Sequence, residues 1–278
     1  MPRDPGAALR ALHRPGDPFV LANAWDRGSA RVLAALGARA IGTTSAGFAF
    51  TRGLPDGARI SLDDTLAHAE DLVSATDLPV SADLENGYAE APDAIAGVIR
   101  RAAAAGLAGG SIEDTDLPGD GAYPFYLAVE RVRAAAAAAR ALPRDFVLVA
   151  RADGLLTGGY SLAAALQRAE AFADAGADCV YVPLLPDLAA LRRVVAACPV
   201  PVNALAAGPL AATTLADLAA AGAARISLGS GLARLAQGAF VAAARDILGP
   251  GRFASLAAAA PGAEMDALLR AGGARDDV

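Results

Sequence analysis

The feature of this sequence that most constrains its fold is a regular alternation of short apolar runs with alanine-rich helical stretches. These runs hold β-branched or large side chains, and stretches such as residues 146–150 (Phe-Val-Leu-Val-Ala) do not alternate apolar with polar residues, which is typical of strands covered on both faces of a parallel sheet. Eight such runs are predicted as strands, at residues 19–25, 40–45, 79–85, 109–114, 146–151, 179–184, 201–205 and 225–229. This pattern predicts an α/β fold.

Helical patterns occupy the segments between these strands, and several have recognisable ends. Ser61 is a predicted N-cap followed by acidic residues, and Pro92 stands at a first helical position. The expected helices begin near 61 and then span 92–105, 127–141, 162–175, 188–197, 215–221 and 232–247. Glycines shortly before the second, fourth, sixth and eighth strands can supply left-handed C-caps. The repeat indicates a series of strand–helix units.

Eight such units without a Gly/Ser-rich linker predict a single (β/α)8 TIM-type barrel within a one-domain chain of 278 residues. The barrel is expected at about residues 15–250, and 251–278 are expected to form extra C-terminal helices. These would cover the barrel bottom or reach a neighbouring subunit. The competing fold is an open doubly wound sheet, but residues 23–28 (Asn-Ala-Trp-Asp-Arg-Gly) lack the glycine pattern of a dinucleotide-binding turn.

Composition excludes several classes of protein. The mean hydropathy is +0.38, yet no stretch of about 18 apolar residues is free of charges or Pro/Gly breaks, so no membrane association is expected. A net charge of −6 and a pI near 5.0 argue against a nucleic-acid partner. The start of the chain does not resemble a secretory leader, and its two cysteines lack metal-ligand spacing. A cytoplasmic location is therefore expected.

Polar residues gather where the predicted strands end, and the active site of a (β/α)8 barrel lies at that face. The carboxylates found there are Asp56, Asp83, Glu85, Glu113 and Asp114. Because clustered carboxylates repel one another, a cation or protons must neutralise them. Oxygen ligands favour Mg2+, or Mn2+ in its place. Asp83 and Glu85 are two residues apart, so on one strand both would face the barrel axis.

Several polar and aromatic residues near the predicted strand ends also have a purely structural interpretation. Asp114 and Asp153 would serve equally well as caps of the helices that follow them. Trp25, the single tryptophan, suits either the core or the wall of a substrate site. His13 precedes the barrel and His68 falls within a helix, so both are expected in surface or packing roles.

Five segments in order resemble the isocitrate lyase/phosphoenolpyruvate mutase superfamily. They are residues 44–47 (Thr-Ser-Ala-Gly), 54–56 (Leu-Pro-Asp), 83–88 (Asp-Leu-Glu-Asn-Gly-Tyr), 112–114 (Ile-Glu-Asp) and 150–153 (Ala-Arg-Ala-Asp). The resemblance covers about residues 15–250. It implies a (β/α)8 barrel whose last helix is often exchanged between the subunits of a dimer, and tetramers overall. A homodimer or homotetramer is therefore expected.

The resemblance also implies a metal site. Asp83 matches the direct Mg2+ ligand of the family. Glu85, Glu113 and Asp56 match acids that hold the water shell of the metal, although the family usually has Asp at the position of Glu85.

A substrate site is implied in the same way. Ser45, Ala46 and Gly47 match a turn that binds a substrate carboxylate through its backbone N–H groups and hydroxyl. Arg151 matches the arginine that holds the 2-oxo acid, and Asn203 lies where some lyases bind a second carboxylate. Arg151 and Glu113 are the implied catalytic residues.

The loop after the fourth strand departs from the family pattern. The lyases carry Lys-x-Cys-Gly-His there, with the cysteine as proton donor, whereas residues 115–126 contain no Lys, Cys or His. The mutases place a lysine directly after the Glu-Asp pair, where this chain has Thr115. Tyr123 is the candidate donor within the loop, and turn packing is its alternative role.

The implied activity is that of a Mg2+-dependent carbon–carbon lyase acting on a small 2-oxo acid, or on a dicarboxylate that yields one, through a metal-stabilised enolate. Residues 115–126 would close over the substrate. Oxaloacetate decarboxylation and phosphonopyruvate P–C hydrolysis are alternatives that need no loop cysteine. A non-catalytic 2-oxo acid binding protein is the alternative from another class.

Overall fold

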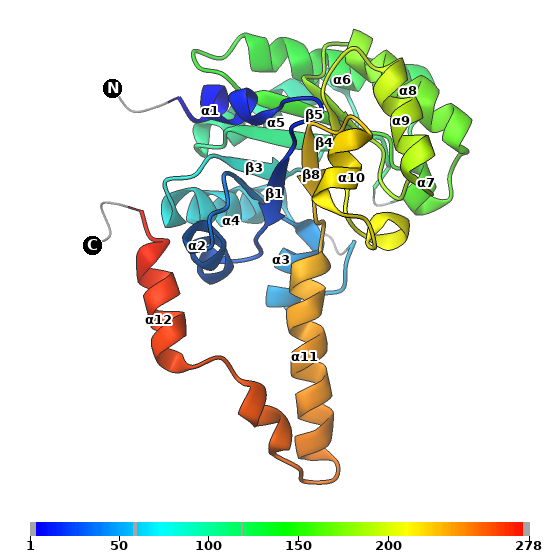
Figure 1. Cartoon of the computed structure of the whole chain (residues 1–278). Helices are drawn as coiled ribbons and strands as arrows, with labels where there is room; N and C mark the ends of the chain where they lie inside the picture. Colours follow the sequence, from blue (N-terminus) through cyan, green and yellow to red (C-terminus); the bar gives the residue numbers. More distant parts are fainter. Residues whose placement is uncertain (1–3, 58–59, 118, 120, 275–278) are drawn as a thin grey trace.

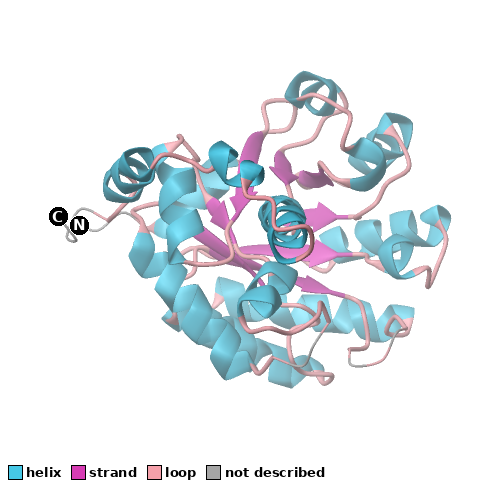
Figure 2. Cartoon of the chain, turned by 90° about the horizontal axis from the view of Figure 1, so that it is seen from below, coloured by secondary structure: helices cyan, strands magenta, loops and turns pink. Residues whose placement is uncertain are grey.

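The computed structural model describes residues 4–57, 60–117, 119, 121–274 of the chain, and within them eight parallel strands form a closed barrel in the order β1 to β8. Figure 2 shows the strands enclosed by the ring of helices. The strands are β1 (Phe19–Asn23), β2 (Ile41–Gly42), β3 (Val80–Asp83), β4 (Gly109–Glu113), β5 (Val147–Arg151), β6 (Cys179–Tyr181), β7 (Val202–Leu205) and β8 (Arg225–Ser227). The predicted (β/α)8 barrel is confirmed.

The strands are shorter than the apolar runs predicted. The second run, 40–45, yields only two strand residues because Thr44 already caps the helix α3 (Ser45–Thr51). The third strand ends at Asp83, and Glu85 lies beyond it with a φ of 47°. The expectation that Asp83 and Glu85 share one strand face is therefore wrong, because the chain turns between them.

The expected helices are present to within two residues, and the helices at 27–35, 154–157 and 208–210 occur in addition to them. Together they are α2 (Arg27–Ala35), α4 (Leu62–Ala75), α5 (Pro92–Ala104), α6 (Phe125–Arg140), α7 (Gly154–Thr157), α8 (Leu162–Asp174), α9 (Leu188–Ala197), the 3-10 turn η1 (Gly208–Leu210), α10 (Leu215–Ala220) and α11 (Gly231–Leu248). The predicted cap is confirmed, since the Ser61 hydroxyl accepts a hydrogen bond from the Asp64 amide at 3.1 Å. None of the described helices has both the length and the apolar character needed to cross a bilayer.

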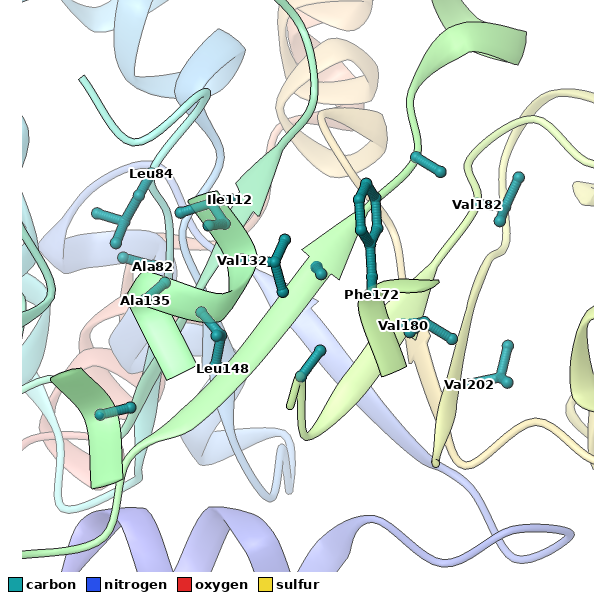
Figure 3. Close-up of a cluster of buried hydrophobic side chains, with 14 of the residues drawn as sticks. Ala82, Leu84, Ile112, Val132, Ala135, Leu148, Phe172, Val180, Val182 and Val202 are labelled. Carbon is teal, nitrogen blue, oxygen red and sulfur yellow. The ribbon is translucent and has the colours of Figure 1, made fainter. Parts of the chain in front are cut away.

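The main core lies between the barrel and the surrounding helices. Figure 3 shows strand residues such as Leu148 and Val180 facing helix residues such as Val132 and Phe172. Many helix contributions to this layer are alanines, including Ala135 and others on α6 and α8. Small side chains let the helices approach the sheet closely, so the alanine-rich composition builds the core of the barrel rather than a membrane segment.

The lower end of the barrel is covered by the N-terminal helix α1 (Pro5–Leu12) rather than by the C-terminal extension. Leu9 is fully buried against residues at the strand starts, among them Phe19 and Val147. Arg10 fixes the helix by ion pairs to Asp145 at 2.6 Å and Asp178 at 2.7 Å. The sequence pattern predicts no helix before the first strand, so α1 is an addition to the expected fold.

The C-terminal extension continues from α11 into the 3-10 helix η2 (Ala254–Ala258) and α12 (Gly262–Ala271). α11 projects away from the barrel, and α12 returns to its outside (Figure 1), where it packs on α2. The extra helices are confirmed, and the expectation that they cover the barrel bottom is wrong because α1 occupies that position. Residues 275–278 of the expected extension lie outside the described residues.

Candidate functional site

A cavity of about 650 Å³ opens at the C-terminal ends of the strands, where the sequence predicted the site. Its wall includes the predicted residues Ser45, Ala46, Asp56, Asp83 and Arg151. Further inside, it reaches Ser81, Ser111, Tyr181, Arg225 and Ser227. The cavity therefore runs from the barrel mouth down into its interior.

Arg151, the last residue of β5, is the centre of a charged cluster at this mouth. Its Nη1 lies 3.0 Å from Asp83, and its Nη2 lies 3.0 Å from Glu113. Asp153 receives hydrogen bonds from Nε at 3.1 Å and Nη2 at 2.5 Å. The planar guanidinium thus joins acids from three successive loops or strand ends, and these acids raise the pKa of Arg151 well above its ordinary value against the effect of burial.

Asp83 is held from its other side by β2 and the start of α3. The Ser45 hydroxyl donates to Asp83 Oδ2 at 2.9 Å, and the Asp83 amide donates to Thr43 Oγ1 at 2.9 Å. The side chain keeps 18% of its surface exposed. Asp83 is therefore fixed in position and still accessible from the cavity.

Glu113 of this cluster and the neighbouring Glu85 both resist ionisation. Burial raises the pKa of Glu113 to about 8, with the charges of Asp153 and Asp83 adding to the effect and Arg151 opposing it. Burial, followed by the charge of Asp83, raises the pKa of Glu85 to about 7. One guanidinium is thus too little positive charge for the acids gathered around it.

The donor set fits a hard divalent cation. All candidate ligands are carboxylate oxygens, and a second positive charge would offset the burial and, after it, the repulsion that raise the pKa values of Glu85 and Glu113. Within the described residues, no three His, Cys, Asp or Glu side chains are grouped as a complete ligand set. Mg2+ usually retains several waters and takes one or two carboxylates directly, so Asp83 with outer acids suits it.

The turn predicted to bind a carboxylate lies at the start of α3. Ser45 and Ala46 line the cavity, whereas Gly47 is buried behind them. A Cβ on Gly47 would lie 2.6 Å from Thr44 Cγ2 and 2.8 Å from Trp25 Cβ. Gly47 and Trp25 thus pack against each other, and Trp25 does not belong to the cavity wall.

The two histidines have packing roles, as expected. His68 stacks on Phe48 with ring centroids 3.9 Å apart, and its Nε2 lies 2.9 Å from the carbonyl oxygen of Trp25. His13 follows α1 and contacts Phe19 edge to face.

Tyr123 lies away from the cavity. It is 6% exposed, its hydroxyl accepts a hydrogen bond from Asn86 Nδ2 at 3.0 Å, and its ring lies under the Arg131 guanidinium. Its surroundings match the packing alternative and not the position of a proton donor. Of the loop 115–126, Pro118 and Asp120 lie outside the described residues, and an antiparallel bridge joins Thr115 to Ala122.

Of the remaining predicted residues, Asp56 lies at the rim of the cavity, and Asn203 and Asp114 are buried. Asp56 is exposed at the rim, where its Oδ1 accepts from the Gly57 amide at 3.0 Å. Asn203 is fully buried in β7 and donates from Nδ2 to Ser227 at 2.9 Å. Asp114 has a structural role, accepting from Tyr160 at 2.7 Å and Arg168 at 2.9 Å.

The polar interior of the barrel is not predicted by the sequence pattern. Asp153, for which a helix cap was one of the interpretations, pairs with Arg151 and makes no cap hydrogen bond. Arg225 and Ser81 line the cavity and are absent from the predicted site residues. Their alternation with Ile226 and Val80 on short strands is the signal that would have placed them inside.

Comparison with known proteins gives matches along most of the chain. Residues 9–248 match the family model described as phosphoenolpyruvate phosphomutase. An uncharacterised protein of Mycobacterium tuberculosis is 39% identical over 226 residues, which is 79% of this chain and 80% of the relative. The 2-methylisocitrate lyase of Salmonella typhimurium is 32% identical over 208 residues, or 72% of this chain and 69% of the enzyme.

Solved structures agree in fold. A lyase/mutase candidate from Burkholderia cenocepacia superposes with a TM-score of 0.89 at 45% identity, covering 95% of this chain and 94% of that one. A phosphonopyruvate hydrolase, solved in complex with oxalate and Mg2+, gives a TM-score of 0.80 at 25% identity, covering 96% and 95%.

Proposed function

Because this chain belongs to the phosphoenolpyruvate mutase/isocitrate lyase superfamily, we propose that it is a Mg2+-dependent lyase that cleaves a C–C or P–C bond in a small 2-oxo acid or a dicarboxylate that yields one. The observation that carries the proposal is the cluster of Arg151 with Asp83, Glu113 and Asp153 at the mouth of the cavity. It combines a fixed guanidinium with excess carboxylate at the catalytic face of the barrel.

In this proposal Asp83 is the direct ligand of Mg2+, and Glu85, Glu113 and Asp56 hold its water shell. When bound, the metal would act as a Lewis acid toward the oxygens of the 2-oxo acid. Asp83 suits this role because the Ser45 hydroxyl holds the carboxylate oxygen that does not face Arg151, and Thr43 holds the backbone amide of Asp83.

The substrate would be oriented by the protein itself. The backbone amides at Ser45 and Ala46 open α3, where the helix N-terminus favours an anionic group. Arg151 contributes a planar donor pair that can transfer hydrogen bonds from its acids to a substrate carboxylate. In the metal-free protein burial raises the pKa of Glu113 to about 8, so this side chain can hold a proton near neutral pH before the metal binds.

The identity of the reaction is proposed from the named relatives. Among these, a 2-methylisocitrate lyase and a phosphonopyruvate hydrolase represent C–C and P–C cleavage. Tyr123 is not proposed as the acid, because it contacts Asn86 and Arg131 instead of the cavity. Phosphonopyruvate hydrolysis and oxaloacetate decarboxylation remain the second candidates, since neither needs the loop cysteine.

The test is a substrate panel. Purified protein is assayed with Mg2+ against oxaloacetate, phosphonopyruvate, isocitrate and 2-methylisocitrate, with Arg151→Met as the site control. Turnover of one of them by the wild type, lost in the variant and with EDTA, is expected. Tight Mg2+-dependent oxalate binding without turnover would favour the non-catalytic 2-oxo acid binding protein. Absence of both binding and turnover would overturn the proposal.

A further inference from the structure

Arg225 is a buried guanidinium for which the part of the chain that the structure describes supplies no anion. The residue begins β8, is 5% exposed and lines the cavity. Its Nε and Nη1 are buried without a hydrogen-bond partner. None of the ion pairs formed by the described residues includes it, in contrast to Arg151 in the same cavity. A buried charge without a partner lowers the stability of the folded protein, because it loses its hydration and no ion pair compensates for that loss.

The groups around Arg225 do not neutralise it. Tyr181 and Cys179 are its nearest ionisable neighbours in electrostatic effect, and burial raises the pKa of each to about 12, so both stay neutral near pH 7. Asp83 has only a weak effect on Arg225 and is already paired with Arg151. Burial lowers the pKa of Arg225 itself, although a guanidinium remains protonated in proteins.

Other polar atoms in the barrel interior are also left without partners. Ser81 Oγ is buried without a hydrogen bond, and Ser81 lines the same cavity. Asn203, the neighbour of Arg225 across the strand pair, leaves Oδ1 unpartnered. Buried polar groups are normally satisfied, so these atoms mark a place where a polar ligand or ordered water belongs.

The strand β3 gives the depth of Ser81 below Asp83, the proposed metal ligand. Ser81 lies two residues before Asp83 on β3, so it faces the interior one layer lower. Two strand residues correspond to about 6–7 Å. A ligand held at Asp83 and Arg151 would therefore need a chain of a few carbons to bring a second acidic group to this layer.

We propose that Arg225, with the hydroxyl of Ser81, binds a second carboxylate of the substrate, so that the cavity selects a dicarboxylic 2-oxo acid of four or five carbons over its monocarboxylic counterpart. This inference rests on the proposed function and specifies its substrate class. Arg225 acts here as a specificity residue at the inner end of the cavity, and Arg151 acts at the mouth.

The test compares matched ligands by calorimetry with Mg2+. 2-Oxoglutarate is paired with 2-oxopentanoate, and oxaloacetate with 2-oxobutanoate, because each pair differs in the second carboxylate. We expect the wild type to bind at least one diacid ten-fold or more tightly than its partner. Arg225→Met should bring that ratio to within two-fold of one while changing the monoacid affinity less than two-fold. Arg225→Lys should restore part of the preference.

Controls separate this effect from changes in folding or net charge. Arg192→Met removes the same charge from the exposed face of α9 and should leave the diacid preference unchanged. Ser81→Ala provides a second variant that keeps all charges and should reduce the preference less than Arg225→Met. Equal affinity of the wild type for both members of each pair, or a preference retained in Arg225→Met, would overturn the inference.

A metal-free arm distinguishes failure of this inference from failure of the proposed function. If 2-oxo acids and oxalate do not bind with Mg2+, the proposed function fails, and thermal stabilisation by succinate in EDTA then decides the inference. Stabilisation of the wild type but not of Arg225→Met would support an anion site at Arg225 independent of that function. No stabilisation of either protein would overturn this site as well.

Discussion

Arg151 and Asp83 form a 3.0 Å ion pair between Nη1 and Oδ1 that joins β5 to β3 across the mouth of the barrel. The same aspartate accepts a hydrogen bond from Ser45 through its other oxygen. Asp83, the candidate metal ligand, is therefore in direct contact with Arg151, the residue expected to bind the substrate carboxylate. A cation at Asp83 would weaken its attraction for Arg151 and free hydrogen-bond donors of the guanidinium. The pairing therefore suggests that metal binding prepares Arg151 to receive a carboxylate.

Replacing Asp83 with Asn should weaken Mg2+ binding by at least ten-fold, because a carboxylate held in position at the cavity wall is lost. Calorimetry with Mg2+ and oxalate measures this. Asp266→Asn, which makes the same change on the exposed face of α12, should bind Mg2+ like the wild type. Undiminished Mg2+ affinity in Asp83→Asn would remove Asp83 from the ligand assignment.

Glu113 should make the metal-free protein less stable as the pH rises. Its pKa of about 8 in the folded state exceeds the ordinary value of about 4.3, so the folded protein holds a proton that the unfolded chain releases. The stabilisation is complete below the ordinary value and is lost as the pH approaches 8. The limiting slope is about 1.4 kcal/mol per pH unit.

Urea unfolding in EDTA at pH 5.5 and pH 8 measures the effect of Glu113. Glu113→Gln should show a smaller loss of unfolding free energy between the two pH values than the wild type. Glu85, whose pKa is raised to about 7, acts with the same sign, so some loss should persist. An identical loss in wild type and variant would show that Glu113 ionises normally.

The sequence predicted the barrel well because strand and helix periodicity is a local property. It also placed Asp83 and Arg151 correctly at strand ends, and the structure brings them together. The position of the Glu85 side chain was not predictable, because it depends on the backbone conformation beyond the end of β3. The position of Tyr123 was not predictable either, because it depends on which side chains pack together in three dimensions. The pairing of Arg151 with Asp153 could not be read from spacing, since a cap at the same position has the same sequence.

Gly47 offers a test of packing beside the site. An alanine there would place its Cβ 2.6 Å from Thr44 and 3.2 Å from Ala233, which forces α3 away from α11. We expect Gly47→Ala to destabilise the protein by about 1–3 kcal/mol. Gly97→Ala, on α5 with nothing near its added Cβ, should be neutral or stabilising and serves as the control in chemical denaturation. Equal stability of both variants would show that α3 can shift freely.

The projecting helix α11 predicts self-association. Of its 18 residues only Ala233 is buried, and Leu235 and Phe240 are exposed by 72% and 68%. Such an apolar face is costly in water, and a second copy offering the same helix could cover it in an isologous exchange. Light scattering at micromolar concentration should therefore give a dimer or tetramer.

Phe240→Asp should shift that equilibrium toward monomer, since it introduces a charge where two apolar faces would meet. Leu36, at the end of α2, is also 68% exposed, and Leu36→Asp should leave the mass of the oligomer unchanged. A monomeric wild type would contradict helix exchange. A stable oligomer in Phe240→Asp with the wild-type mass would place the interface elsewhere, and α11 would then need another explanation for its exposed apolar side chains.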